Sequence, residues 1–88
     1  MAETFLLEVA TPERLLVNEQ ATEAQIPAAN GYLGILPGHA ALLAELGHGE
    51  LSYVAEGRRR TLTIDGGFFE ISNDHARVLA NSAEKPAE

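Results

Sequence analysis

The sequence predicts an all-β domain, either a sandwich or a barrel, and three observations lead to that prediction. Apolar residues recur at every second position in several short runs, and turn-forming residues separate the runs at short intervals. No segment between the runs is long enough to supply the helical crossover that a parallel sheet requires. Because successive side chains of a strand point to opposite faces, each run offers one apolar face to a core.

The alternating runs are distributed along the chain from its start almost to its end. The first run places Glu8 between apolar residues of one parity, and a later run alternates threonine and aspartate with leucine and isoleucine. Such alternation is typical of strands with one buried and one solvated face. The predicted core positions are Phe5, Leu7 and Val9; Leu15 and Val17; Ala24 and Ile26; Leu33 and Ile35; Leu62 and Ile64; and Ala76, Val78 and Ala80.

Glycine, proline, asparagine and aspartate mark the predicted turns, because glycine permits positive φ and proline pre-sets φ. One stretch, residues 39–46, has high helix propensity but is short for an independent helix and stops at Gly47. A short strand or a single helical turn is predicted there. Turns are predicted at residues 11–13, 30–31, 37–38, 47–49, 56–57, 66–67 and 73–74.

A chain of 88 residues predicts one domain with a modest core. We assign the sandwich to residues 1–80 and a polar C-terminal tail to residues 81–88. The N-terminus lacks the basic and apolar regions of a signal peptide, and no apolar run approaches the ~20 residues needed to span a bilayer. We therefore expect a cytoplasmic location or an equivalent compartment.

The charge balance argues against nucleic acid and anionic lipid as partners. Six basic residues against 13 acidic ones give a formal charge of −7, which repels polyanions on average. The one basic cluster is Arg58-Arg59-Arg60, which follows the predicted hairpin tip Glu56-Gly57. It is interpreted as a solvated loop or, alternatively, as a docking contact for an acidic partner.

No constellation in the sequence predicts catalysis or a cofactor. His39, His48 and His75 form neither of the pairs that place two imidazoles on one side of a metal, so no metal site is predicted. No serine lies in a nucleophile elbow, and no glycine-rich loop leads into a helix that could hold phosphate. The chain has no cysteine, which excludes disulfides and thiolate ligands.

Several strands carry apolar residues on both parities. The candidates for an apolar outer face are Leu6, Leu16, Phe68 and Phe69, and the sequence leaves open which phenylalanine faces the core. A strand with one solvated face should be polar at such positions. The outer face is either shielded by loops and edge strands or covered by a partner protein.

The most informative segment is Asn30-Gly31-Tyr32-Leu33-Gly34-Ile35-Leu36-Pro37-Gly38-His39-Ala40. Its glycines and proline prescribe the backbone path, and amphipathic side chains lie near the predicted bend, as suits a docking surface. From its first glycine onward it resembles a signature of F-type ATP synthase epsilon subunits. Leu7 to Glu13, Gly66-Gly67-Phe68-Phe69-Glu70-Ile71 and Val78-Leu79-Ala80 also resemble elements of that family, in the same order.

The resemblance implies a flattened antiparallel β-sandwich of about ten short strands. It also implies a non-catalytic rotor subunit of the central stalk, which couples proton-driven rotation to ATP synthesis. Such a subunit binds the gamma subunit and the membrane c-ring, without cofactor or nucleic acid. It would lie at the cytoplasmic face of the bacterial inner membrane or the stromal face of the thylakoid.

The residue roles implied by the resemblance follow the motifs. Docking on the c-ring is assigned to Asn30, Tyr32 and His39, and gamma binding to the apolar outer face. The alternative role of His39 is to brace the turn by hydrogen bonding. Tyr32 stands where the family often has an acidic residue, which suggests a more apolar contact with the ring. The helical hairpin that binds ATP in some members is absent from this sequence, so no nucleotide binding is expected. The predicted structural turn residues are Gly31, Gly34, Pro37, Gly38, Gly66 and Gly67.

A small ligand-binding β-sandwich, for example for carbohydrate, is the alternative from another functional class. Carbohydrate sites use exposed aromatic platforms, and here the only tyrosines are Tyr32 and Tyr53, with no tryptophan. A metal-dependent enzyme is a third possibility, disfavoured by the histidine spacing.

Overall fold

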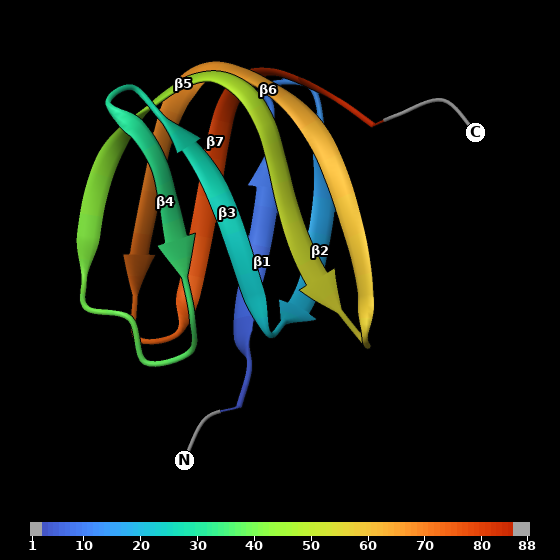
Figure 1. Cartoon of the computed structure of the whole chain (residues 1–88). Helices are drawn as coiled ribbons and strands as arrows, with labels where there is room; N and C mark the ends of the chain where they lie inside the picture. The colour runs from blue at the N-terminus through green and yellow to red at the C-terminus, as the bar shows by residue number, and fades with distance from the viewer. Residues whose placement is uncertain (1–2, 86–88) are drawn as a thin grey trace.

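The computed structural model describes residues 3–85, which form seven β-strands in one continuous sheet (Figure 1). The spatial order of the strands is β2-β1-β7-β6-β5-β3-β4. Within the described residues no helix could cross a membrane. The strands are β1 (Phe5–Ala10), β2 (Leu15–Ala21), β3 (Glu23–Ala28), β4 (Gly31–Ile35), β5 (Leu42–Ala55), β6 (Arg58–Ser72) and β7 (His75–Glu84).

Two long strands turn this sheet into a sandwich. β5 and β6 pair along almost their whole length and arch over the top of the molecule, so each contributes to both layers (Figure 1). One layer contains β2, β1, β7, the second half of β6 and the first half of β5. The other contains the first half of β6, the second half of β5, β3 and β4.

The predicted all-β sandwich is confirmed, but the prediction of about ten strands is wrong. The predicted turns at residues 47–49 and 66–67 lie inside β5 and β6, because their glycines let the strands bend without ending them. The pairing is also mixed, since β1 runs parallel to β7 while the other five strand pairs in the described part of the chain are antiparallel.

The core fills the space between the layers, and the alternation predicts most of it. Every predicted core position in β1, β3, β6 and β7 is buried, as are Val17 and Ile35. Leu33 is only partly buried against the core. Leu15 is exposed, because a register shift pairs Val9 with Val17 but Ala10 with Leu15. This β-bulge reverses the parity of the strand, so Leu15 points outward and Leu16 packs against the core.

Gly67 is the tightest point of the arch. A Cβ atom on Gly67 would lie 2.1 Å from the carbonyl oxygen of Leu79 and 2.9 Å from the Cα of Ala80. Its φ of +116° also lies in a region that residues with a side chain rarely adopt. Glycine is therefore required where β6 bends against β7.

The last strand extends into the segment assigned to the C-terminal tail. Asp65 pairs with Ser82, Ile64 with Ala83 and Thr63 with Glu84, and Ala83 packs against the core. The last residues of that segment, 86–88, lie outside the described residues.

Candidate protein-docking surfaces

A row of apolar side chains crosses the outer face of one layer. Phe68 of β6 pairs with Leu79 of β7, Leu79 pairs with Ala10 of β1, and Ala10 pairs with Leu15 of β2. Residues that pair directly point to the same face of a sheet. Phe68 is 59% exposed, Leu15 53% and Leu79 49%, so this row, termed the apolar row, presents hydrophobic surface across four strands.

A second row, parallel to the first, is charged. Glu70 pairs with Arg77, and Arg77 with Glu8 of β1. Glu8 also contacts the imidazole of His75, and the guanidinium of Arg77 lies 3.7 Å from the same carboxylate. An apolar stripe bordered by charged residues is typical of a surface that binds another protein.

Of the four residues predicted for an outer apolar face, only Phe68 belongs to the apolar row. Leu6 is half-buried on the same face, two residues before Glu8, and Leu16 packs against the core. The assignment of Phe69 to the outer face is wrong, because its side chain is 0% exposed in the core. Phe69 pairs with Val78, another core residue, and the strand alternation therefore turns Phe68 outward.

Leu15 and Leu79 are surface residues that were not predicted from the sequence. Leu79 lies between the core residues Val78 and Ala80, so its opposite parity could have revealed it. Leu15 could not have been found in this way, because nothing in the sequence marks the bulge in β2.

The structure separates the residues predicted for one docking loop. Asn30 and Tyr32 lie at the start of β4, beside the β3–β4 turn, whereas His39 follows the other end of that strand (Figure 1). β4 runs through the middle of the predicted loop and pairs with β3 over its whole length. These side chains therefore form two separate surfaces at opposite ends of the strand.

Tyr32 lies against the bend of β5. Its hydroxyl accepts a hydrogen bond of 3.0 Å from the backbone N–H of Glu50, and the ring is 56% exposed. A Cβ atom on Gly49 would lie 2.7 Å from the Tyr32 hydroxyl, so the glycine makes room for this contact. The tyrosine thus presents a fixed, amphipathic ring at the surface.

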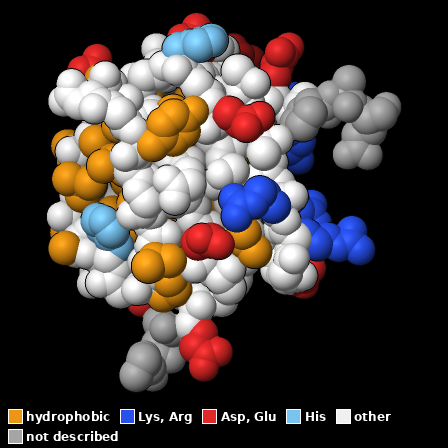
Figure 2. All heavy atoms as spheres, viewed as in Figure 1, with side chains coloured by type: hydrophobic (Ala, Val, Ile, Leu, Met, Phe, Trp, Pro, Cys, Tyr) orange, Lys and Arg blue, Asp and Glu red, His pale blue; other side chains and the backbone are white. Residues whose placement is uncertain are grey.

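Tyr32 also lines an open groove of about 430 Å³ between the β3–β4 turn and the first half of β5. Leu33, Leu42, Leu43 and Ala44 contribute its apolar surface. Hydrophobic side chains gather on the left of the view in Figure 2, the side on which β4 and the first half of β5 lie in Figure 1.

The other end of β4 is a turn fastened to a neighbouring hairpin. The N–H of Gly38 donates to the Asp74 carboxylate at 2.6 Å, and the N–H of His39 donates to the carbonyl of Leu36 at 3.1 Å. The imidazole Nδ1 of His39 lies 2.7 Å from the carbonyl oxygen of Ala40. These contacts give His39 a role in bracing the turn.

The predicted structural glycines divide into two groups. Gly31, Gly38, Gly66 and Gly67 have positive φ, as a turn or a sharp bend requires. Gly34 does not: it is an ordinary residue of β4 that the Gln25 side chain covers, so its assignment as a turn residue is wrong.

Tyr53 is buried between the layers and bonded to a distant carboxylate. Its hydroxyl donates a hydrogen bond of 2.8 Å to Glu19 of β2. Burial, together with this hydrogen bond and the charge of Glu19, raises the pKa of Tyr53 to about 12. With Tyr53 buried, the carbohydrate-binding alternative retains only Tyr32 as an exposed tyrosine platform.

The raised pKa predicts a loss of stability at high pH. Ionisation of Tyr53 is disfavoured in the folded chain, so its contribution is complete below the unfolded pKa of about 10 and is lost as the pH rises toward about 12. We expect the urea midpoint of the native chain to fall more between pH 9 and pH 12 than that of Tyr53→Phe. Equal falls in the two proteins would contradict this prediction.

Within residues 3–85, no group of three or more histidine, aspartate or glutamate side chains is placed to hold a metal ion. The His48 imidazole lies 3.4 Å from the Asp65 carboxylate, but both are well exposed on the arch. The His39 imidazole contacts the carbonyl oxygen of Ala40, and the His75 imidazole contacts the Glu8 carboxylate at a separate place in the fold.

Comparison with known proteins identifies the family of this sandwich. The model of the ATP synthase delta/epsilon chain β-sandwich domain matches residues 4–86. The ATP synthase epsilon chain of Solibacter usitatus is 58% identical over all 88 residues, which cover 66% of that relative. The corresponding chain of Koribacter versatilis is 49% identical over 88 residues, or 62% of its length.

Two solved assemblies contain the same fold. A chain of the Euglena gracilis mitochondrial ATP synthase, solved as an OSCP/F1/c-ring assembly, matches 97% of this chain with a TM-score of 0.89 and 22% identity, over 55% of its own length. A chain of the central stalk and c-ring of the Tetrahymena thermophila enzyme gives a TM-score of 0.76 at 14% identity, covering 91% of this chain and 65% of its own.

The chain thus spans less than two thirds of the length of these relatives, but the family model matches nearly all of it. The protein belongs to the family of ATP synthase delta/epsilon chain β-sandwich domains.

Proposed function

We propose that this domain is a non-catalytic part of an ATP synthase rotor, where it binds the gamma subunit and docks on the membrane c-ring. The observation that carries the proposal is the apolar row, whose three large side chains are about half exposed on the described sandwich. Family membership supplies the context, since the relatives are named ATP synthase epsilon chains. In this role the domain couples proton-driven rotation to ATP synthesis by transmitting torque and carries no chemistry of its own.

The gamma subunit is the proposed partner of the apolar row. A stable interface of this kind buries on the order of 1,200–2,000 Å² in total, with an apolar centre and a polar rim. Phe68 and Leu79 supply the centre, and the charged row that contains Glu8 and Arg77 supplies one side of the rim.

The c-ring is the proposed partner of the β3–β4 turn, through Asn30 and Tyr32. Tyr32 is exposed, and its hydrogen bond to Glu50 fixes the ring, so docking costs little side-chain entropy. An amphipathic ring suits contact with the wet, polar loops of a membrane protein. His39 acts indirectly in this proposal, by bracing the opposite turn. The domain would then sit peripherally at the cytoplasmic face of the bacterial inner membrane, or at the stromal face of a thylakoid.

Replacing Tyr32 tests the ring contact. In a reconstituted rotor, we expect Tyr32→Ala to weaken c-ring association and lower the protons pumped per ATP hydrolysed, because the docking ring is removed. Leu36→Ala is the matched control, since Leu36 is 59% exposed at the other end of β4. A rotor that tolerates Tyr32→Ala and fails with Leu36→Ala would move the contact to the His39 end of the strand.

A further inference from the structure

The cationic side chains of this acidic protein are concentrated at one edge of the sandwich. The chain has six lysine and arginine residues, and four of them line one open cavity of about 530 Å³. Figure 2 shows the Lys and Arg side chains (blue) gathered along the right of the view. The four cations are Arg58, Arg59, Arg60 and Lys85, and Tyr53, Thr61 and Leu62 complete the lining.

Within residues 3–85, the floor of this cavity is a strand edge that pairs with no other strand. Between Arg58 and Leu62, β6 pairs with β5 on one side, whereas its pairing with β7 begins only at Thr63. Glu56 and Gly57 both have positive φ, as in a type I′ hairpin, whose flanking residues exchange both backbone hydrogen bonds. The alternation of an antiparallel ladder then directs the N–H and C=O groups of Arg59 and Thr61 away from β5.

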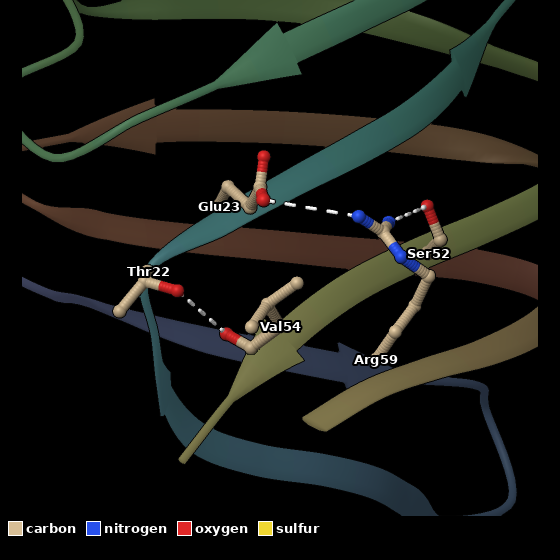
Figure 3. A network of polar contacts seen from close by, with 5 residues as sticks. All are labelled: Thr22, Glu23, Ser52, Val54 and Arg59. Atoms are coloured by element: carbon tan, nitrogen blue, oxygen red, sulfur yellow. Dashed lines mark hydrogen bonds and ion pairs between the residues drawn. The ribbon is translucent and has the colours of Figure 1, made fainter. Parts of the chain in front are cut away.

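The arginines of this edge are not equivalent. Arg59 is engaged on the outer surface, where its guanidinium lies 3.8 Å from the Glu23 carboxylate and donates to the Ser52 hydroxyl at 3.4 Å (Figure 3). Arg60 pairs with Tyr53 and Arg58 with Ala55, both of which face inward. Arg58 and Arg60 thus share the inner face of the hairpin and border the cavity.

We propose that this edge binds an extended acidic peptide segment of a partner protein, which adds as a strand beside Arg58–Leu62. The free backbone groups supply the hydrogen bonds of strand addition, and the cations select acidic side chains at alternate positions. A small anion such as phosphate would use the cations but leave the strand edge unsatisfied. The proposal is independent of the rotor assignment, because it uses none of the residues of the apolar row or the β3–β4 turn.

The groove beside Tyr32 offers an internal control, because it contains Glu45 and no cation. An acidic peptide selected by charge should therefore bind the Arg58–Leu62 edge and leave that groove unperturbed. Binding at both grooves would mark a non-specific affinity for extended peptide and overturn the proposal.

The test follows the backbone amide signals of the ¹⁵N-labelled chain by NMR during titration with a peptide of alternating glutamate and valine. We expect shifts confined to the hairpin and its edge, and an affinity about tenfold weaker in Arg60→Glu, where an attraction becomes a repulsion. Arg14→Glu makes the same charge change at an exposed turn and should bind as the native chain does. Equal weakening in the two variants would overturn the site.

Two further experiments distinguish strand addition from simple charge attraction. The same peptide N-methylated at every residue keeps its charge but loses the backbone donors of both strand edges, and we expect it not to bind. If it binds as well as the unmodified peptide, strand addition is wrong. Inorganic phosphate should not displace the peptide beyond the effect of an equal ionic strength of chloride; specific displacement would assign the site to a small anion instead.

Discussion

Replacing Gly67 with alanine is expected to cost about 3–5 kcal/mol of stability or to prevent folding. The new methyl group would lie 2.1 Å from the carbonyl oxygen of Leu79, within the backbone of the paired strand. Relief requires β6 and β7 to separate where they pair, since Gly67 is itself the partner of Ala80. The φ of +116° adds backbone strain to the clash.

Gly57→Ala is the matched control for this effect. Gly57 also has positive φ, at +75°, but a Cβ atom there would meet nothing within 4 Å. Only the conformational cost remains, on the order of 1 kcal/mol. Urea unfolding of the two variants separates steric overlap from backbone strain, and equal losses would show that the overlap at Gly67 is relieved cheaply.

The contrast between these glycines shows what the sequence could predict. A glycine pair such as Gly66-Gly67 indicates an unusual backbone, and the sequence pattern predicts a turn there. The structure uses it to bend a strand of fifteen residues against its neighbour. Whether such a glycine forms a turn or bends a strand depends on the backbone that lies next to it. At Gly67 this neighbour is the carbonyl of Leu79, which belongs to another strand and is not evident from the local sequence.

The alternation predicts well which side chains face the core within one strand. It fails where strand register or the spatial arrangement of the strands determines their positions. It places Phe5, Leu7 and Val9 in the core because each lies within an uninterrupted run. It misplaces Leu15, because one bulge reverses the parity of the residue before it.

The candidate sites depend still more on tertiary arrangement. Asn30 and His39 are near in sequence, yet an intervening strand places them at opposite ends of the fold. Conversely, Tyr53 and Glu19 are 34 residues apart and share a hydrogen bond that no local pattern predicts. Lys85 likewise reaches the arginines of the hairpin only because β7 pairs with β6.

The two adjacent phenylalanines are expected to have opposite roles, one in stability and the other in binding. Phe69→Ala should cost about 3–5 kcal/mol, because it leaves a cavity among fully buried residues. Phe68→Asp should leave the unfolding midpoint nearly unchanged, since that side chain is largely exposed. Its effect should instead fall on the proposed interface with the gamma subunit.

Binding of Phe68→Asp to the gamma subunit should weaken by about 30-fold or more, as expected when a central aromatic contact of about 2 kcal/mol is lost. Leu79→Asp should behave similarly, because Leu79 is the paired neighbour of Phe68 in the apolar row. Gln25→Asp introduces the same charge on β3, on an exposed side chain outside the row, and should bind normally. Calorimetry on variants that keep the native unfolding curve measures these affinities and tests whether the apolar row binds gamma. If both row variants bind gamma as tightly as Gln25→Asp does, the partner of the apolar row is another protein.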